Sequence, residues 1–275
     1  MADTAQLPHL LRLIDDDSPA ARREIARALA AFGQSLPERL AELSAPPTED
    51  QRRQIDSLMQ ERARELLRSA WAGWLAIEDD KQRLEAALEV LAAYLAGPLR
   101  SVDLAKLLDD LADAYRASHP AADPRLLAEF LFEKRGIRGA ADDYYRPENS
   151  SLVYAVERKR GIPITLACLF ILMGRRLGLE IEGCNFPGHF LALAKTGGET
   201  RVVDCFDGGR FLTQEDFAEA GGTAKAIQAA LSLQAGSEEI VARVLRNLHA
   251  AFTRVGREND ARLMTELLQS LGEAA

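Results

Sequence analysis

A histidine and an aspartate, His189 and Asp204, are the pair in this sequence whose types and spacing best fit proton transfer. The residues between them alternate as strands do, and Gly197 with Gly198 is typical of a two-residue hairpin turn. That turn sets Leu191 opposite Asp204, so the histidine and the aspartate become diagonal neighbours on one face of the hairpin. A carboxylate that orients an imidazole is the arrangement used in general acid–base catalysis. The hairpin therefore predicts a His–Asp pair that can move a proton.

The start of a helix upstream of this hairpin supplies the candidate nucleophiles. Asn149 is predicted to cap a helix over residues 150–160, with Gly161 as its left-handed stop. The unpaired N–H groups of a helix start carry positive potential and can stabilise an oxyanion. Ser150 and Ser151 stand at this start, and either becomes a nucleophile only when a base removes the hydroxyl proton.

Four further residues are predicted to line a cleft around the pair: Asn149, Cys184, Pro187 and Gly188. Simpler roles exist for the polar residues. A histidine at this place can bond a backbone carbonyl, and an aspartate before a glycine-rich turn often caps that turn. The simplest role of Asn149 is that of the helix cap. The capping role of the aspartate is compatible with orienting an imidazole, so both interpretations are kept.

The three cysteines, Cys168, Cys184 and Cys205, are expected to be free thiols, because their number is odd and no secretion signal is evident. Cys168 falls inside an apolar helix, where a thiol behaves as a small hydrophobic group. A metal site of Cys184, His189 and Cys205 would be short of ligands and lacks the usual spacing. We therefore expect neither a metal nor another cofactor.

A buried helix and a small sheet are predicted to position these residues. Apolar residues repeat at helical spacing from Pro163 until Gly178 ends the helix. The period then drops to two, which predicts antiparallel strands near residues 183–185, 189–195 and 200–204. The expected fold class is α+β and mostly α, with a small antiparallel sheet.

Five short segments follow one another in this region: RPENSSL, RKRGIPITL, RRLGLEIEG, FPGHFLA and VDCFDGG. Together they resemble the SirB-type bacterial branch of the transglutaminase-like superfamily, over about residues 130–217. The resemblance implies a papain-like fold, with a nucleophilic Cys at a helix start, then a His opening a strand, then an Asp on the next strand. His189 and Asp204 match the second and third of these, whereas Asn149, Ser150 and Ser151 occupy the helix start where the Cys would be expected.

The remainder of the chain is predicted to be helical. Residues 1–125 are interpreted as an all-helical domain whose first helix pair is HEAT-like, and residues 126–220 as the transglutaminase-like core. Residues 221–275 are interpreted as C-terminal helices, with a small helix over residues 223–231 and then a tetratricopeptide-like pair. A single copy of either repeat is expected to cover a neighbouring layer rather than to form a binding solenoid.

The composition limits the function classes. With 275 residues the chain can bury a substantial core, and its net charge of −8 argues against a nucleic-acid partner. The longest apolar run, Ile164–Met173, is too short to cross a bilayer, and the first residues lack the pattern of a signal peptide. No membrane association and a cytoplasmic location are therefore expected. Arg158–Arg160 and Arg175–Arg176 are interpreted as solvated helix ends, with binding of an acidic partner as the alternative.

Two functions of different classes follow. The first is a non-catalytic binding or regulatory module, whose cleft has lost its nucleophile and takes a protein or peptide segment or a small ligand. The second is an acyl transferase, peptidase or amidase in which Ser150 or Ser151 attacks, His189 moves the proton and Asp204 holds the imidazole. We favour the first, since acyl transfer in the superfamily that the chain resembles depends on a thiolate. The oligomeric state is left open.

Overall fold

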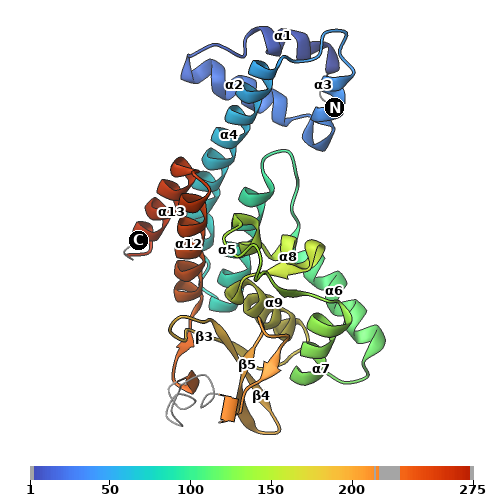
Figure 1. The fold of residues 1–275 in the computed structure, drawn as a ribbon, viewed down its shortest axis with the longest axis vertical. Coiled ribbons are helices and arrows are strands. Elements are labelled where there is room, and N and C mark those ends of the chain that lie inside the picture. Colours follow the sequence, from blue (N-terminus) through green and yellow to red (C-terminus); the bar gives the residue numbers. More distant parts are fainter. Residues whose placement is uncertain (1–2, 214, 217–229, 273–275) are drawn as a thin grey trace. The chain divides into compact units, whose positions relative to one another are not determined.

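The computed structural model describes residues 3–213, 215–216 and 230–272. Its contacts divide the chain into two compact units, one of Met1–Trp74 with Ala93–Val102 and the other of Leu75–Ala92 with Asp103–Ala275. The predicted class, α+β and mostly α, is confirmed, and Figure 1 shows the elements coloured along the sequence. None of the helices in the described ranges is long and apolar enough to cross a membrane.

The predicted domain ranges 1–125, 126–220 and 221–275 remain a prediction. The two compact units are a separate division, based on contacts, with other boundaries. Most of the helix predicted over residues 223–231 lies outside the described residues.

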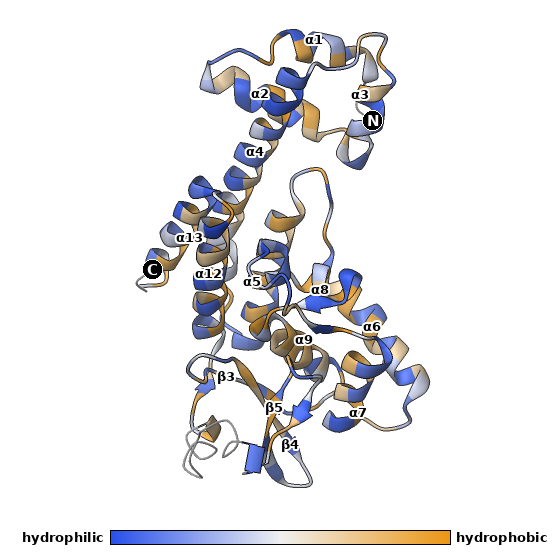
Figure 2. Ribbon diagram, in the orientation of Figure 1, coloured by the Kyte–Doolittle hydropathy of each residue, from blue (hydrophilic) through white to orange (hydrophobic). Residues whose placement is uncertain are grey.

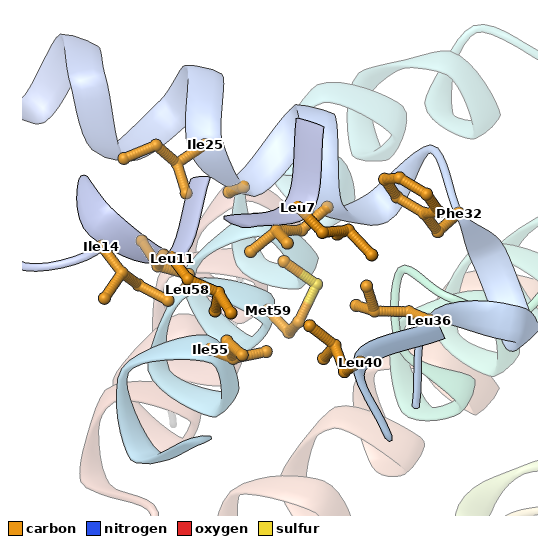
Figure 3. Packing of buried hydrophobic residues seen from close by; sticks show 12 residues of the cluster. Leu7, Leu11, Ile14, Ile25, Phe32, Leu36, Leu40, Ile55, Leu58 and Met59 are labelled. Carbon is orange, nitrogen blue, oxygen red and sulfur yellow. The ribbon is translucent and has the colours of Figure 1, made fainter. Parts of the chain in front are cut away.

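The first unit is a small helical assembly around one apolar core. Its helices are α1 (Leu7–Arg12), α2 (Pro19–Ala30), α3 (Leu36–Ala41) and most of α4 (Glu49–Leu75). Thr48 and Gln51 form a capping box at the start of α4, since the backbone N–H of each residue donates to the side chain of the other. Figure 3 shows leucine, isoleucine and methionine side chains from the four helices pointing toward one another, together with Ile14 and Phe32 from the connecting segments. The HEAT-like character of the first helix pair stays a prediction.

The second unit contains the remaining helices and the sheet. Its helices are α5 (Asp80–Ala96, which belongs to this unit as far as Ala92), α6 (Leu104–Ser118), α7 (Pro124–Ala128), the π-helical turn η3 (Glu129–Lys134), the 3-10 turn η4 (Pro147–Ser150), α8 (Leu152–Arg158), α9 (Pro163–Arg176), α12 (Ser237–Arg254) and α13 (Glu258–Ser270). The α12 and α13 helices lie side by side as a pair (Figure 1). Their tetratricopeptide-like character stays a prediction.

The sheet of the second unit carries the predicted hairpin. Its strands are β3 (Ile181–Cys184), β4 (Leu191–Thr196), β5 (Glu199–Asp204), β6 (Arg210–Phe211) and β7 (Gln234–Ala235), in the order β6-β5-β4-β3-β7 with every neighbouring pair antiparallel. Ala192 pairs with Val203, which is the predicted register. Gly197 and Gly198 have φ of 58° and 83°, as a tight hairpin turn with two left-handed residues requires. His189 lies just before β4 rather than inside it.

Helix α9 forms the centre of this unit. Every residue from Pro163 to Gly174 is buried, and Figure 2 shows the helix as mainly hydrophobic. A helix that is apolar on all sides must be covered on all sides, and α9 contacts α6, α7, α8 and strands β3 and β4. Gly174 allows close approach of the sheet, because a Cβ there would lie 2.7 Å from Cδ1 of Ile181. Gly178, at φ of 71°, follows the end of the helix as predicted.

The end of α9 is tied down rather than solvated. Arg176 donates to both carboxylate oxygens of Glu85 on α5 at 2.7 and 2.8 Å, and to Asp109 on α6 at 2.7 Å. Its side chain is only 15% exposed. The interpretation of Arg176 as a solvated helix end is therefore wrong, because the adjacent helices supply carboxylates that the local sequence does not reveal.

The start of α8 also differs from the prediction. Ser151, not Asn149, is the N-cap, and its Oγ accepts the backbone N–H of Tyr154 at 3.3 Å. Asn149 is drawn into the preceding turn η4 because its side-chain amide donates to the carbonyl oxygen of Asp143. At the other end, Lys159 takes the left-handed conformation with φ of 60°, and Gly161 instead pairs in a short parallel bridge of β1 (Arg138–Gly139) with β2 (Arg160–Gly161).

Candidate functional site

The predicted His–Asp pair is present. Nε2 of His189 lies 2.9 Å from Oδ1 of Asp204, with the histidine side chain 32% exposed and the aspartate side chain 16% exposed. The same Oδ1 accepts the backbone N–H groups of Phe206 at 2.9 Å and Asp207 at 3.1 Å. Asp204 therefore caps the turn after β5 and, through the same oxygen, contacts the imidazole. The turn fixes the carboxylate, and the carboxylate fixes the ring.

The electrostatics of Asp204 favour its ionised form. Burial raises the pKa of this carboxyl, but the hydrogen bond and charge of His189 and the N–H groups of Asp207 and Phe206 together outweigh burial and hold the pKa below its ordinary value. An ionised carboxylate can only accept, so Nε2 of His189 carries the proton in this hydrogen-bond assignment. In the neutral ring Nδ1 is then the basic nitrogen.

The loop before β4 holds His189 in place through α12. The backbone N–H of His189 donates to the carbonyl of Phe186 at 3.3 Å, and Nη1 of Arg243 donates to the same carbonyl at 3.0 Å. Arg243 also bonds the side chain of Asn185 and lies over the ring of Phe190, 5.4 Å from its centroid. Sequence reasoning missed Arg243, since it is distant in the chain and nothing in its local pattern marks it.

An aromatic wall borders the pair. The ring of Phe206 lies 6.1 Å from that of His189 at an interplanar angle of 82°, and the ring of Tyr144 lies 6.4 Å from Phe206. Gly139 on β1 makes room for this wall, because a Cβ there would lie 2.6 Å from the ring of Phe206. The glycine thus lets the bridge of β1 and β2 approach the turn that carries Phe206.

The predicted helix start is a buried structural junction. Asn149, Ser150 and Ser151 are 1%, 5% and 5% exposed. The amide of Asn149 and the hydroxyl of Ser151 are each used within the local backbone, as described above. Within the described ranges no hydrogen bond joins Ser150 or Ser151 to His189.

The predicted cleft residues separate into two groups. Pro187 and Gly188 are exposed in the loop before His189, and Gly188 has φ of 76°. Cys184 is fully buried beneath this loop, and its Sγ donates to the carbonyl of Ala230 at 3.2 Å. The structure therefore brings Pro187 and Gly188 to the surface beside His189, and it places Cys184 in the apolar packing of the sheet.

All three thiols are buried, and their acidity reflects it. Burial raises the pKa of Cys168 to about 12 and, against smaller opposing effects of Phe186 and Arg243, that of Cys184 to about 11. Burial, with the nearby carboxylate of Asp204, raises the pKa of Cys205 well above its ordinary value. A thiol in such a place stays protonated at neutral pH and is a poor nucleophile.

Comparisons with known proteins agree with this architecture. A family model described as the transglutaminase-like superfamily matches residues 101–246. A UPF0162 protein of Xylella fastidiosa is 39% identical over 135 residues, which cover 46% of this chain and 48% of that protein. The match thus spans about half the length of this relative.

Two further relatives match less closely. A UPF0162 protein of Pseudomonas aeruginosa is 29% identical over 203 residues, covering 66% of this chain and 71% of that protein. F-box only protein 21 of Mus musculus is 28% identical over 146 residues, covering 50% of this chain and 23% of that protein. No solved structure matches. Since the family model covers more than half of the sequence, the chain belongs to the transglutaminase-like superfamily.

Proposed function

We propose that this chain is a non-catalytic binding or regulatory member of the superfamily, whose surface around His189 takes a protein or peptide segment. The observation that carries the proposal is the state of the cysteines. Acyl transfer through sulfur requires a thiolate that meets the substrate, and all three thiols are buried with raised pKa values. None is placed to attack a bound carbonyl.

The serines at the helix start support the same conclusion. They stand where the resemblance leads one to expect a cysteine, and a helix dipole does little to ionise a hydroxyl group. The Oγ of Ser151 already accepts a backbone N–H as a helix cap, and Ser150 is buried, with only 5% of its surface exposed. The two serines at the nucleophile position of an acyl-transfer site thus serve the helix cap and the buried packing instead.

The histidine half is suited to binding. His189 is about one-third exposed, and Asp204 holds its ring so that Nδ1 offers an acceptor in a fixed direction. A peptide N–H or a hydroxyl is a natural donor to that nitrogen. Pro187 and Gly188 are exposed directly before His189 in the chain, while the ring of Phe206 borders the imidazole. The SirB-type assignment, the tetratricopeptide-like character of α12 and α13 and a cytoplasmic location belong to this proposal.

One observation favours a second candidate. The contact between His189 and an ionised Asp204 is the arrangement that orients an imidazole for proton transfer. If Ser150 or Ser151 reached Nδ1 when a substrate bound, the chain would be an acyl transferase or amide hydrolase. The second candidate therefore differs from the first in a single measurable property, the reactivity of a serine.

The test is covalent labelling of the native protein with a serine-directed fluorophosphonate and, separately, with iodoacetamide, read by intact-protein mass spectrometry. We expect neither reagent to label the folded chain, and iodoacetamide to label all three cysteines after denaturation. Labelling of Ser150 or Ser151 that disappears in the His189→Ala variant would overturn the proposal and establish the enzyme.

A further inference from the structure

A pocket of about 470 Å³ lies between the loop before η4 and the turn from α12 to α13. Its lining is Asp143, Tyr145, Arg146, Pro147, Glu148, Arg254, Val255 and Arg257. Neither His189 nor Asp204 lines it, so it is a second site on the same unit.

The apolar part of this pocket is unusually exposed. Among the described residues, Tyr144, Tyr145 and Val255 are three of the five large hydrophobic side chains that remain exposed, and the other two belong to the first unit. Tyr145 and Val255 are 45% and 50% exposed, and the ring of Tyr144 lies 5.3 Å from that of Tyr145. Exposed apolar side chains that gather in one place mark an interaction surface, and tyrosine is enriched in such surfaces.

Three arginines line the pocket, and one of them has no carboxylate partner in the described chain. Arg146 is paired with Glu148 at 3.2 Å and with Asp143 at 3.7 Å, and Arg257 is paired with Asp260 at 2.6 Å. All three arginines lie over an aromatic ring, and the guanidinium of Arg254 lies over that of Tyr145, 4.6 Å from the centroid. Arg254 differs from the other two because no carboxylate of the described chain pairs with it.

The ring of Tyr145 therefore orients the guanidinium of Arg254, and the N–H groups of Arg254 stay available to a ligand. Stacking on an aromatic ring fixes the plane of a guanidinium without using its edge, and that edge matches a carboxylate. The residue stands in the last turn of α12, where the helix carbonyls carry only a partial negative charge. The described chain thus leaves the full charge of this exposed guanidinium to solvent, where a ligand carboxylate can reach it.

We propose that this pocket binds an acidic peptide segment. A carboxylate of the segment bonds to Arg254, and a neighbouring apolar side chain of the segment covers Tyr145 and Val255. Arginine and tyrosine are the residue types that contribute most to such contacts, and a charge-assisted bond to a guanidinium is stronger than a neutral one. The inference concerns a site outside the His–Asp pair and holds for a catalytic and for a non-catalytic chain alike.

The test is fluorescence anisotropy of a short fluorescein-labelled peptide that alternates glutamate and leucine, titrated with the full chain. We expect saturable binding, and an affinity about fivefold weaker for Arg254→Gln, which is the loss of one exposed ion pair. Tyr145→Ala, which removes both the apolar cover and the support of the guanidinium, weakens binding further. The matched control is Arg262→Gln, an exposed arginine of α13 outside the pocket that bonds Asn259; we expect it to bind as the unaltered chain does.

Three results would overturn the inference. One is equal affinity for a peptide that carries glutamine in place of glutamate. Another is a loss in Arg262→Gln as large as that in Arg254→Gln. The third is an unaltered chain that binds no peptide, including one that binds anionic lipid vesicles instead. Circular dichroism of each variant separates a lost contact from a lost fold.

Discussion

The hairpin side and the helix side of the candidate site use their polar side chains in opposite ways. On the hairpin side, His189 is partly exposed and Asp204 presents it with one ring nitrogen unused by the described protein. On the helix side, Asn149 and Ser151 are buried and each polar side chain is consumed by a backbone group a few residues away. The difference teaches that one side of a site can leave a ring nitrogen available to a ligand while the polar groups of the other side serve the local backbone.

The largest effect is expected on the helix side, from Asn149→Ala. The change leaves the carbonyl of Asp143 without its donor and opens a small cavity, which should lower the free energy of unfolding by about 2 kcal/mol. Urea denaturation measures it. Asn259→Ala, at an exposed position of α13, is the control and should change stability very little. A loss below that of the control would mean that Asn149 is not a structural residue, and the comparison would fail.

Asp204→Asn tests the hairpin side, with a smaller expected loss of about 1.5 kcal/mol at neutral pH, since a charge-assisted bond becomes a neutral one. The pKa of Asp204 is lowered in the folded state, so its ionisation stabilises the fold fully above the ordinary aspartate pKa of about 3.9. That stability is lost as the pH falls through the lowered pKa.

The measurement is urea denaturation of both proteins between neutral pH and strong acid. The stability difference between the unaltered chain and Asp204→Asn should shrink as the pH falls. A difference that stays constant across this range would contradict the ionised state of Asp204 and remove the contrast with the helix side.

Ser151→Ala sharpens the comparison at the cap of α8. Loss of the bond from Oγ to the N–H of Tyr154 should cost about 1 kcal/mol of stability, the usual value for an N-cap. Ser150→Ala is the neighbouring control, with no helix-capping bond to lose. Thermal denaturation reads both variants. If the control loses as much stability as Ser151→Ala, then the cap is not the role that distinguishes the two serines.

The smallest effect has the opposite sign. Lys159→Gly should raise stability by about 0.5 kcal/mol, because glycine accepts the left-handed conformation without strain although it costs backbone entropy. Gly161→Ala should instead lower stability, since a Cβ there would lie 2.9 Å from Cδ2 of Leu166. Differential scanning calorimetry of the two variants tests both signs together, and reversed signs would restore Gly161 as the left-handed stop of α8.

The hairpin could be predicted from the sequence because its determinants are local. Gly197 and Gly198 fix the turn, the turn fixes the register, and the register brings His189 to Asp204. The buried helix α9 could be predicted equally well, because its length and its apolar period are visible in one continuous segment of the sequence.

The parts that escaped prediction depend on contacts between distant segments. Asn149 is a good cap by residue type, but the carbonyl of Asp143 competes for its amide. The local sequence predicts that Arg176 is a solvated helix end, but its guanidinium bonds to Glu85 and Asp109 on two other helices. Arg243 has no local signal at all. Residue type limits what a side chain can do, and the tertiary structure decides which of its options is used.

A single carbonyl oxygen, that of Phe186, accepts from both His189 and Arg243. It joins the backbone of His189 to Arg243 of α12 without any intermediate residue. The ring of His189 is thus set by Asp204, whereas its backbone shares an acceptor with the C-terminal helix pair. The place of this histidine in the chain therefore depends on a helix that begins nearly fifty residues later in the sequence.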